Sequence, residues 1–324
     1  MDGDRQDGRS DAGGRGWHFG VTLPQIKRSW AEARDAAVAF DRQGYDSVWV
    51  CDHVYGVPLP TLPIFEAWSQ LAAVAALTER VELGTLVTPP FFRNPGVLAK
   101  QLATIDHISG GRVIAGLGAG WFQPEFESYG LPFPALGRRM EALDECARVL
   151  RGLWSQERFS LDGEHFQLKD AICEPKPLRR TPILVGGGGE KVLMGIVARH
   201  ADIWNNMAVS QHLLESKVAA LRRRCDEEGR DFGTLAVSQQ CVVVIAEGED
   251  EAREALAKAR KIYGGHMGGQ LEEHGIWGTP DRVVECLERH RRLGCSGFVI
   301  EFFGRDTRVP AQLFAERVIP QLRS

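Results

Sequence analysis

Short apolar runs alternate with longer amphipathic segments along most of the chain. The apolar runs predict buried strands at residues 19–23, 47–51, 81–87, 113–118, 183–185, 201–205, 236–246 and 297–302. Apolar positions spaced three or four residues apart predict helices at residues 30–43, 65–78, 96–109, 137–154, 191–199, 211–228, 250–262, 281–293 and 308–322. Strands that alternate with helices pair in parallel, joined by helical crossovers. Eight alternations favour a closed (β/α)8 TIM barrel over the open doubly wound sheet that the pattern also allows.

Three segments depart from this alternation. Residues 159–169 carry Asp162-Gly163 between two short alternating stretches, which predicts a β-hairpin. Residues 264–278 are rich in glycine, and we expect a mobile loop there. The polar, glycine-rich residues 1–16 predict a disordered N-terminal tail, so that residues 17–324 form a single barrel domain with insertions.

Composition and charge exclude several classes of function. The chain is 44% hydrophobic and 25% charged, as is ordinary for a globular protein, and its net charge of −4 gives no reason to expect nucleic acid or an anionic membrane as a partner. No apolar run approaches the ~20 residues of a membrane span, and the N-terminus lacks a signal peptide, so we expect a cytoplasmic protein. The seven scattered cysteines form no C-x-x-C pair, which favours reduced thiols. No metal-ligand spacing is present.

The active site of a TIM barrel lies where its strands end, and two polar residues follow the second predicted strand. His53 could exchange a proton near neutral pH, and Asp52 beside it could orient a ring or accept a hydrogen bond. A lone histidine more often has a structural role, so position alone leaves that alternative open.

Glycines follow two further strands. Gly186, Gly187, Gly188 and Gly189 lie between a predicted strand and a predicted helix, where backbone N–H groups and the helix N-terminus could bind a phosphate; a flexible turn is the alternative. Gly118 and Gly120 would let a flat ring lie against the backbone, or would only form a tight turn. Trp121 could form an apolar wall over a planar cofactor, or pack its loop onto the barrel rim.

Several long stretches in the same order carry a family resemblance. They lie at residues 19–25, 45–54, 81–89, 93–100, 106–134, 182–191, 201–205 and 278–283. On these motifs, much of the chain resembles the luciferase-like monooxygenases, in particular their coenzyme F420-dependent branch.

The resemblance implies positions for the cofactor and for catalysis. An isoalloxazine or deazaisoalloxazine ring would lie at the barrel mouth with its phosphate on Gly186–Gly189, supported by a non-proline cis peptide that matches Thr85–Leu86. A histidine matching His53 acts near the transferred hydride in the sugar-phosphate dehydrogenases, with an aspartate matching Asp52 against the cofactor. Those enzymes carry a catalytic glutamate where this chain has Trp121, which argues against sugar-phosphate oxidation and favours a larger, less polar substrate.

We therefore expect an F420-dependent oxidoreductase that transfers a hydride between the deazaflavin and a small organic molecule, with His53 moving the proton. Two alternatives remain at this point. One is a two-component monooxygenase that uses reduced FMN and O2, and the other is a barrel that binds a flavin without catalysis. The resemblance also implies a homodimer.

Overall fold

A closed parallel barrel forms the centre of the molecule. We analysed a computed structural model of the chain, which describes residues 16–57, 59–264, 267 and 270–323. The barrel strands are β1 (His18–Thr22), β2 (Ser47–Val50), β3 (Glu82–Thr85), β4 (Val113–Leu117), β7 (Ile183–Gly186), β8 (Ile203–Asn206), β9 (Ala236–Ile245) and β11 (Gly297–Phe302). Each pairs in parallel with its neighbours, and β9 pairs with both β8 and β11, which closes the barrel. The predicted (β/α)8 barrel is confirmed.

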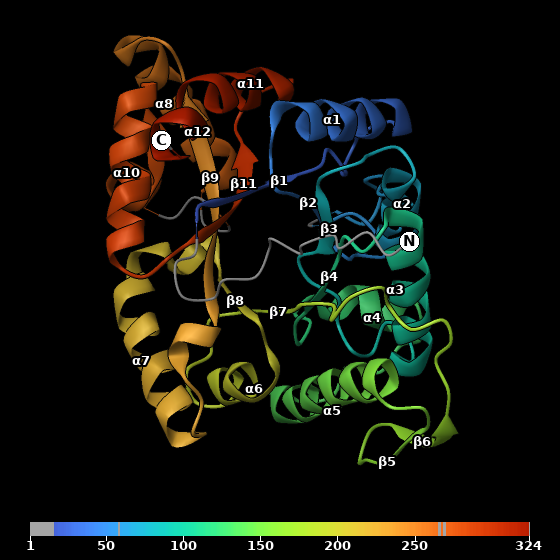
Figure 1. The fold of residues 1–324 in the computed structure, drawn as a ribbon. Coiled ribbons are helices and arrows are strands. Elements are labelled where there is room, and N and C mark those ends of the chain that lie inside the picture. Colours follow the sequence, from blue (N-terminus) through green and yellow to red (C-terminus); the bar gives the residue numbers. More distant parts are fainter. Residues whose placement is uncertain (1–15, 58, 265–266, 268–269, 324) are drawn as a thin grey trace, which may run out of the picture.

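Helices surround the strands on all sides (Figure 1). In chain order they are α1 (Trp30–Gln43), α2 (Ala67–Ala75), α3 (Pro95–Ser109), α4 (Gln123–Ser128), α5 (Leu136–Ser155), α6 (Leu193–His200), α7 (Leu214–Glu227), α8 (Glu249–Tyr263), α9 (Leu271–His274), α10 (Pro280–Arg292), α11 (Arg308–Arg317) and α12 (Ile319–Arg323). Short 3-10 segments, Ala208–Leu213 and Phe232–Thr234, precede α7 and β9. Among the described residues, no helix has the length and apolar character that crossing a membrane requires.

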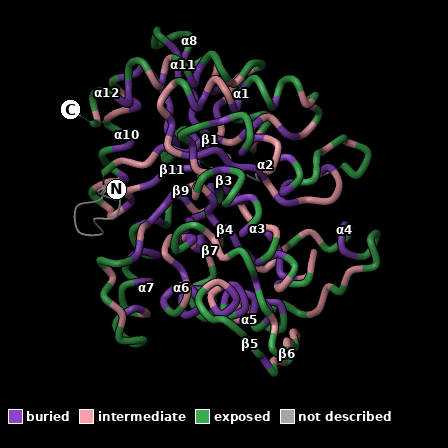
Figure 2. Tube along the Cα trace, turned by 45° about the vertical axis from the view of Figure 1, so that its right-hand side comes forward, coloured by how far each residue is buried: buried purple, intermediate pink, exposed green. Residues whose placement is uncertain are grey.

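Side chains alternate between two apolar layers along each barrel strand. On β11, Phe298 and Ile300 pack outward against the helices, whereas Val299 packs inward with Trp49 and Leu184. The buried positions accordingly follow the strands and the inner faces of the helices, with exposed positions at the periphery (Figure 2). Because successive strand residues face opposite sides, this alternation decides which residues near the strand ends point into the barrel.

The segments outside the alternation are partly as predicted. The hairpin is present as β5 (Phe159–Asp162) and β6 (Gln167–Ala171). The prediction of a loop without secondary structure at residues 264–278 is wrong, because this segment contains α9 and β10 (Ile276–Gly278). The long strand β9 extends beyond its pairing with β8, and its C-terminal part offers a free edge that β10 joins in parallel. Residues 1–15 of the predicted tail and 265, 266, 268 and 269 of the predicted loop lie outside the described residues.

Candidate active site at the barrel mouth

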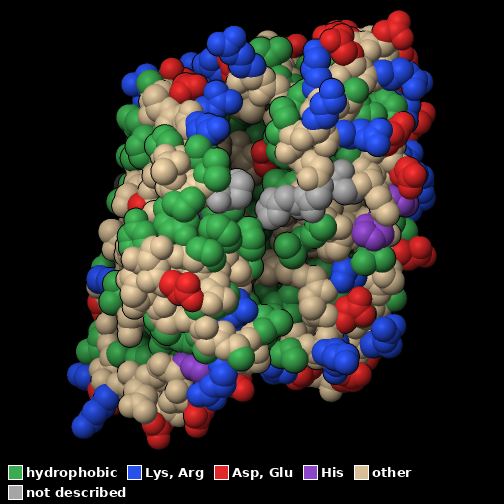
Figure 3. Space-filling model, turned by 180° about the vertical axis from the view of Figure 1, so that it is seen from behind, with side chains coloured by type: hydrophobic (Ala, Val, Ile, Leu, Met, Phe, Trp, Pro, Cys, Tyr) green, Lys and Arg blue, Asp and Glu red, His purple; other side chains and the backbone are tan. Residues whose placement is uncertain are grey.

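The loops after the barrel strands form one end of the molecule, which we call the mouth. Several large apolar side chains of these loops are exposed, among them Phe65, Trp121, Tyr129 and Met207. Viewed from behind, the molecule shows hydrophobic side chains gathered around a central hollow (Figure 3). An apolar hollow with a few polar groups is the usual form of a small-molecule site.

His53 lies at the mouth and is held by a buried carboxylate. Its Nδ1 is 2.8 Å from Oε1 of Glu125, while the other carboxylate oxygen accepts the backbone N–H of Val54 at 3.1 Å. Glu125 is only 1% exposed. The carboxylate accepts the Nδ1 hydrogen, so the Nε2 atom is the one left to exchange a proton. Trp121 lies edge-on to the His53 ring, with centroids 6.1 Å apart.

Glu125 was not among the predicted site residues, because the pattern around it predicts neither a helix nor a strand. The residue lies on the short helix α4, which begins after Phe122 and carries Pro124 in its first turn. Only tertiary structure brings this helix against the loop after β2, 72 residues earlier in the chain. The absence of a glutamate at position 121 therefore does not leave His53 without a carboxylate, and the argument against sugar-phosphate oxidation loses that support.

Asp52 faces away from the barrel interior and is fully engaged. Its carboxylate forms a two-pronged ion pair with Arg93 and accepts the Thr88 hydroxyl at 2.6 Å. Burial lowers the pKa of Arg93, but Asp52 and Glu66 outweigh it and hold that pKa above its ordinary value. Asp52 thus holds the loops after β2 and β3 together, and its contact with a cofactor stays a prediction.

The third strand ends in a bulge, one residue later than predicted. The non-proline cis peptide joins Leu86 and Val87, so its predicted place at Thr85–Leu86 is wrong. The ladder explains the shift: Leu86 N still donates to Val50 O at 2.8 Å, and pairing resumes where Thr88 N donates to Gly116 O at 2.8 Å. The interruption therefore falls after Leu86. The hydroxyl of the buried Thr85 donates to the same Gly116 carbonyl at 3.0 Å.

Three of the predicted cofactor glycines are required by packing within the chain. A Cβ atom on Gly118 would lie 2.2 Å from Cγ2 of Val87, and one on Gly186 would lie 2.8 Å from Cγ1 of the same residue. Gly120 has a φ of 76°, and its Cβ would lie 2.9 Å from the ring of Phe126. The first two glycines make room for the bulge, and the third allows the left-handed turn that leads to Trp121.

The remaining glycines form a loop beside a buried lysine. The N–H groups of Gly188 and Gly189 donate to no other described residue, whereas Nζ of Lys217 donates to the carbonyl of Gly188 at 2.6 Å. The Lys217 side chain is only 7% exposed, and its Nζ also pairs with Oε1 of the half-exposed Glu190 at 3.5 Å. Helix α6 begins at Leu193, two residues later than predicted, and Val192 at its N-cap forms no side-chain capping hydrogen bond. Available N–H groups and a cation suit a phosphate, with less help from the helix terminus than predicted.

A third carboxyl group, Glu301, points into the barrel at the end of β11. Alternation places it on the same inward face as Val299, and the Tyr263 hydroxyl donates to it at 2.8 Å. Burial raises the pKa of Glu301 above its usual range, and the Tyr263 hydrogen bond opposes that effect only in part. No ion pair to Glu301 is present among the described residues. Burial, with the negative charges of Glu301, Asp52 and Glu125, raises the pKa of Cys51 to about 12.

The described residues of the mouth show no arrangement suited to a metal. Within the described part of the chain, no group of three histidine, cysteine, aspartate or glutamate residues could hold a metal ion. The seven cysteines are all free thiols, and six of them are buried.

Comparisons with known proteins agree with this architecture. The family model for luciferase-like monooxygenases matches residues 5–294. An F420-dependent glucose-6-phosphate dehydrogenase of Kineococcus radiotolerans is 39% identical over 210 residues, which cover 62% of this chain and 60% of the relative. An FMNH(2)-dependent dimethylsulfone monooxygenase of Pseudomonas putida is 30% identical over 275 residues, covering 72% of this chain and 75% of the relative.

A solved structure gives the same fold over nearly the whole length. An F420-dependent secondary alcohol dehydrogenase, in complex with an F420-acetone adduct, superposes with a TM-score of 0.83 at 22% identity, over 95% of this chain and all of the other. The family match extends over most of the chain and agrees with the barrel, as the sequence motifs predicted. The chain belongs to the luciferase-like monooxygenase family.

Proposed function

We propose that this protein is an F420-dependent oxidoreductase in which His53 transfers the proton that accompanies a hydride. The observation that carries the proposal is the His53–Glu125 pair at the mouth, with the histidine Nδ1 2.8 Å from a carboxylate that is 1% exposed. The Kineococcus relative, an F420-dependent dehydrogenase by name, supports the same cofactor.

The mouth has the groups needed to hold such a cofactor. Lys217 and the N–H groups of Gly188 and Gly189 would bind its phosphate, and the bulge at Leu86 and Val87 would support its ring. Bound there, the deazaflavin ring supplies a two-electron hydride acceptor or donor.

The chain's own residues position the substrate and move the proton. Glu125 accepts the Nδ1 hydrogen of His53 and holds the imidazole in one orientation, which leaves Nε2 to take a proton from a substrate hydroxyl or give one to a carbonyl. Trp121 and Phe122, whose ring centroids are 5.1 Å apart, form an apolar wall beside His53 that excludes water.

The charges at the mouth favour an uncharged substrate. Asp52 and Glu125 each have a cationic or imidazole partner, whereas Glu301 accepts a hydrogen bond from the neutral Tyr263 hydroxyl and has no ion pair with a described residue. A phosphorylated or carboxylated substrate would meet carboxyl groups close to the reacting position. We therefore propose a neutral alcohol or carbonyl compound as the substrate.

A second candidate is a monooxygenase that uses reduced FMN and O2. The Pseudomonas relative, with 30% identity over 72% of this chain, favours it. Both candidates place a phosphate-bearing tricyclic ring at the mouth, so cofactor binding must distinguish them.

The test is a titration of the purified full-length chain with coenzyme F420 and, separately, with FMN. Cofactor absorbance and tryptophan fluorescence report binding, and the melting temperature gives an independent readout. We expect saturable F420 binding that is weakened in Lys217→Gln but not in Lys258→Gln, whose lysine is 64% exposed on α8. Binding of FMN alone would favour the monooxygenase. If neither cofactor binds, both candidates are wrong.

A further inference from the structure

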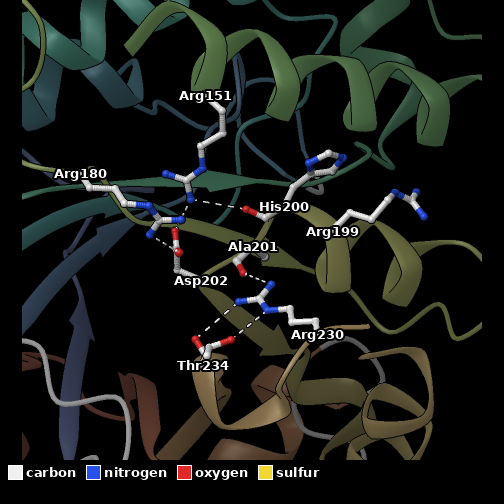
Figure 4. A pocket seen from close by; sticks show the side chains of 8 residues that line it. All are labelled: Arg151, Arg180, Arg199, His200, Ala201, Asp202, Arg230 and Thr234. Atoms are coloured by element: carbon white, nitrogen blue, oxygen red, sulfur yellow. Dashed lines mark hydrogen bonds and ion pairs between the residues drawn. The ribbon is translucent and has the colours of Figure 1, made fainter. Parts of the chain in front are cut away.

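A cavity lined by arginines lies at the end of the barrel opposite the mouth. It has a volume of about 550 Å³, and its lining residues are Arg151, Arg180, Arg199, His200, Ala201, Asp202, Arg230 and Thr234. Most of these lie just before β7, β8 and β9, where the parallel strands begin (Figure 4). The candidate active site lies where the same strands end, so the cavity is a separate feature.

Positive charge exceeds negative charge in this cavity. Arg151 and Arg180 share the single carboxylate of Asp202. Arg230 forms no ion pair with a described residue; its guanidinium donates to backbone carbonyls at the end of α6, such as Ala201 O at 2.6 Å, and to Thr234. These three guanidinium groups have one carboxylate among them, that of Asp202, which contacts Arg151 and Arg180, so two positive charges stay uncompensated within the lining.

The other two cationic residues of the lining do not add to this surplus. Arg199 pairs with Asp144 and Glu228, and its side chain is directed away from Asp202 in Figure 4. The ring of His200 also faces Asp144, at 3.0 Å. These contacts hold α6 to α5 and α7. The uncompensated positive charge of the lining therefore belongs to the group formed by Arg151, Arg180 and Arg230.

Donor atoms remain available on two of these three arginines. Arg180 donates to Asp202 through Nη1 at 2.5 Å, while its Nε and Nη2 donate to no described residue, and its side chain is 71% exposed. Arg151 uses both terminal nitrogens for Thr181, His200 and Asp202, and its Nε has no partner within the described ranges. Such guanidinium forks match the oxygen atoms of a phosphate.

The electrostatics of Arg151 agree with a surplus of positive charge. Burial lowers the pKa of Arg151 below its ordinary value, and the neighbouring charges of Arg180 and Arg230 lower it further. Asp202 acts in the opposite direction but does not reverse the effect. A bound anion would stabilise all three guanidinium groups.

We propose that this cavity is an anion site that binds the phosphate group of a small molecule, independently of the site at the mouth. A phosphate dianion matches the two uncompensated charges. A volume of about 550 Å³ is larger than a phosphate alone requires, so the cavity has room for the organic part of a phosphomonoester.

Calorimetric titration of the full chain tests this proposal. The probes are inorganic phosphate and glycerol 2-phosphate, at constant ionic strength maintained with chloride. We expect saturable binding that weakens roughly ten- to hundredfold in Arg180→Gln, the loss of one charge-assisted hydrogen-bonding group. Because the Arg180 side chain is exposed, its substitution should not disturb the fold. The matched control is Arg253→Gln, whose arginine is 63% exposed, and we expect it to bind the probes as the original protein does. Tighter binding of glycerol 2-phosphate than of inorganic phosphate would identify a phosphomonoester as the ligand. Equal binding of the two probes would identify free phosphate as the ligand.

A third variant separates this cavity from the glycine loop at the mouth. Lys217→Gln should leave phosphate binding at the arginine cavity unchanged. The proposal is overturned if neither probe gives saturable heat at millimolar concentration. It is equally overturned if binding persists in Arg180→Gln and disappears in Lys217→Gln, because the anion would then lie at the mouth.

Discussion

The two ends of the barrel use charged side chains in opposite ways. At the mouth, carboxyl groups predominate, and they hold other side chains: Glu125 holds His53, and Asp52 holds Arg93. At the end where the strands begin, guanidinium groups predominate and they hold the backbone. Arg112, for example, donates to the carbonyls of Ala75, Thr78, Val81 and Ser109.

The two uses of charge indicate where substitutions should affect activity and where they should affect stability. A side chain that is held through one polar atom can still use its other polar atom to contact a ligand, as His53 can use Nε2. A guanidinium that donates to several carbonyls, as that of Arg112 does, fixes helix ends to strand starts and has little capacity left for a ligand, unlike the guanidinium of Arg180. Substitutions at the mouth should therefore change turnover, whereas substitutions at the opposite end should change the free energy of unfolding.

The largest effect should follow from His53→Ala. Loss of a positioned acid–base group lowers turnover by ~10²–10⁴-fold. Cofactor affinity should stay nearly unchanged, because His53 contacts Glu125 rather than the glycine loop. Steady-state turnover and cofactor titration measure the two quantities. The control is His107→Ala, at the end of α3, whose ring contacts the Lys176 carbonyl; equal turnover in both variants would remove His53 from the mechanism.

Glu125→Gln should have a smaller effect of the same kind. The amide keeps the shape of the side chain but weakens a charge-assisted hydrogen bond, which lowers kcat by roughly ten- to hundredfold. A positioning role predicts that KM and cofactor affinity stay near their original values. Glu82→Gln, a half-buried glutamate paired with Arg179 before β7, is the matched control. A drop in melting temperature with unchanged kcat would instead make Glu125 purely structural.

Asp202→Asn should act on stability rather than on turnover. The substitution leaves Arg151 and Arg180 without their shared carboxylate, which lowers the free energy of unfolding by about 1–3 kcal/mol. Denaturant unfolding measures the change, and kcat of the folded variant should match the original protein. Asp306→Asn, which breaks an exposed pair with Arg308, should cost less. A large loss of turnover at full folding would contradict the proposed division between the two ends.

The smallest effect concerns the pH dependence of stability through Glu301. Burial raises the pKa of Glu301 in the folded state, so folding favours its protonated form. Its contribution is therefore most favourable below the ordinary carboxyl pKa and is lost as the pH rises through the higher folded value. Glu301→Gln removes that dependence. Melting temperatures at pH 4 to 7 should show the original protein losing stability relative to the variant as the pH rises; parallel curves would show that Glu301 titrates as in the unfolded chain.

Much of the fold could be predicted from the local spacing of apolar residues along the chain. Period-two and near-3.6 spacings of apolar residues indicate the strands and helices, and their alternation indicates a parallel barrel, because each strand and helix must bury one face against its neighbours. The hairpin at Asp162-Gly163 and the positions of His53 and the glycine runs after their strands were predictable for the same reason. Some boundaries lie up to three residues from their predicted places, as at α7, which begins at Leu214 rather than at residue 211 because a 3-10 segment precedes it.

Contacts between distant segments decided the rest. The residue pattern was enough to place a histidine and glycines at one end of a barrel. The folded chain was needed to pair His53 with Glu125, turn Asp52 toward Arg93, place Lys217 beside Gly188 and bring two arginines to the carboxylate of Asp202. No local spacing encodes such contacts, because they join side chains of different loops whose relative positions depend on how the whole barrel closes. Spacing shows which face a residue occupies, but the partner it meets there depends on the packing of every element between them.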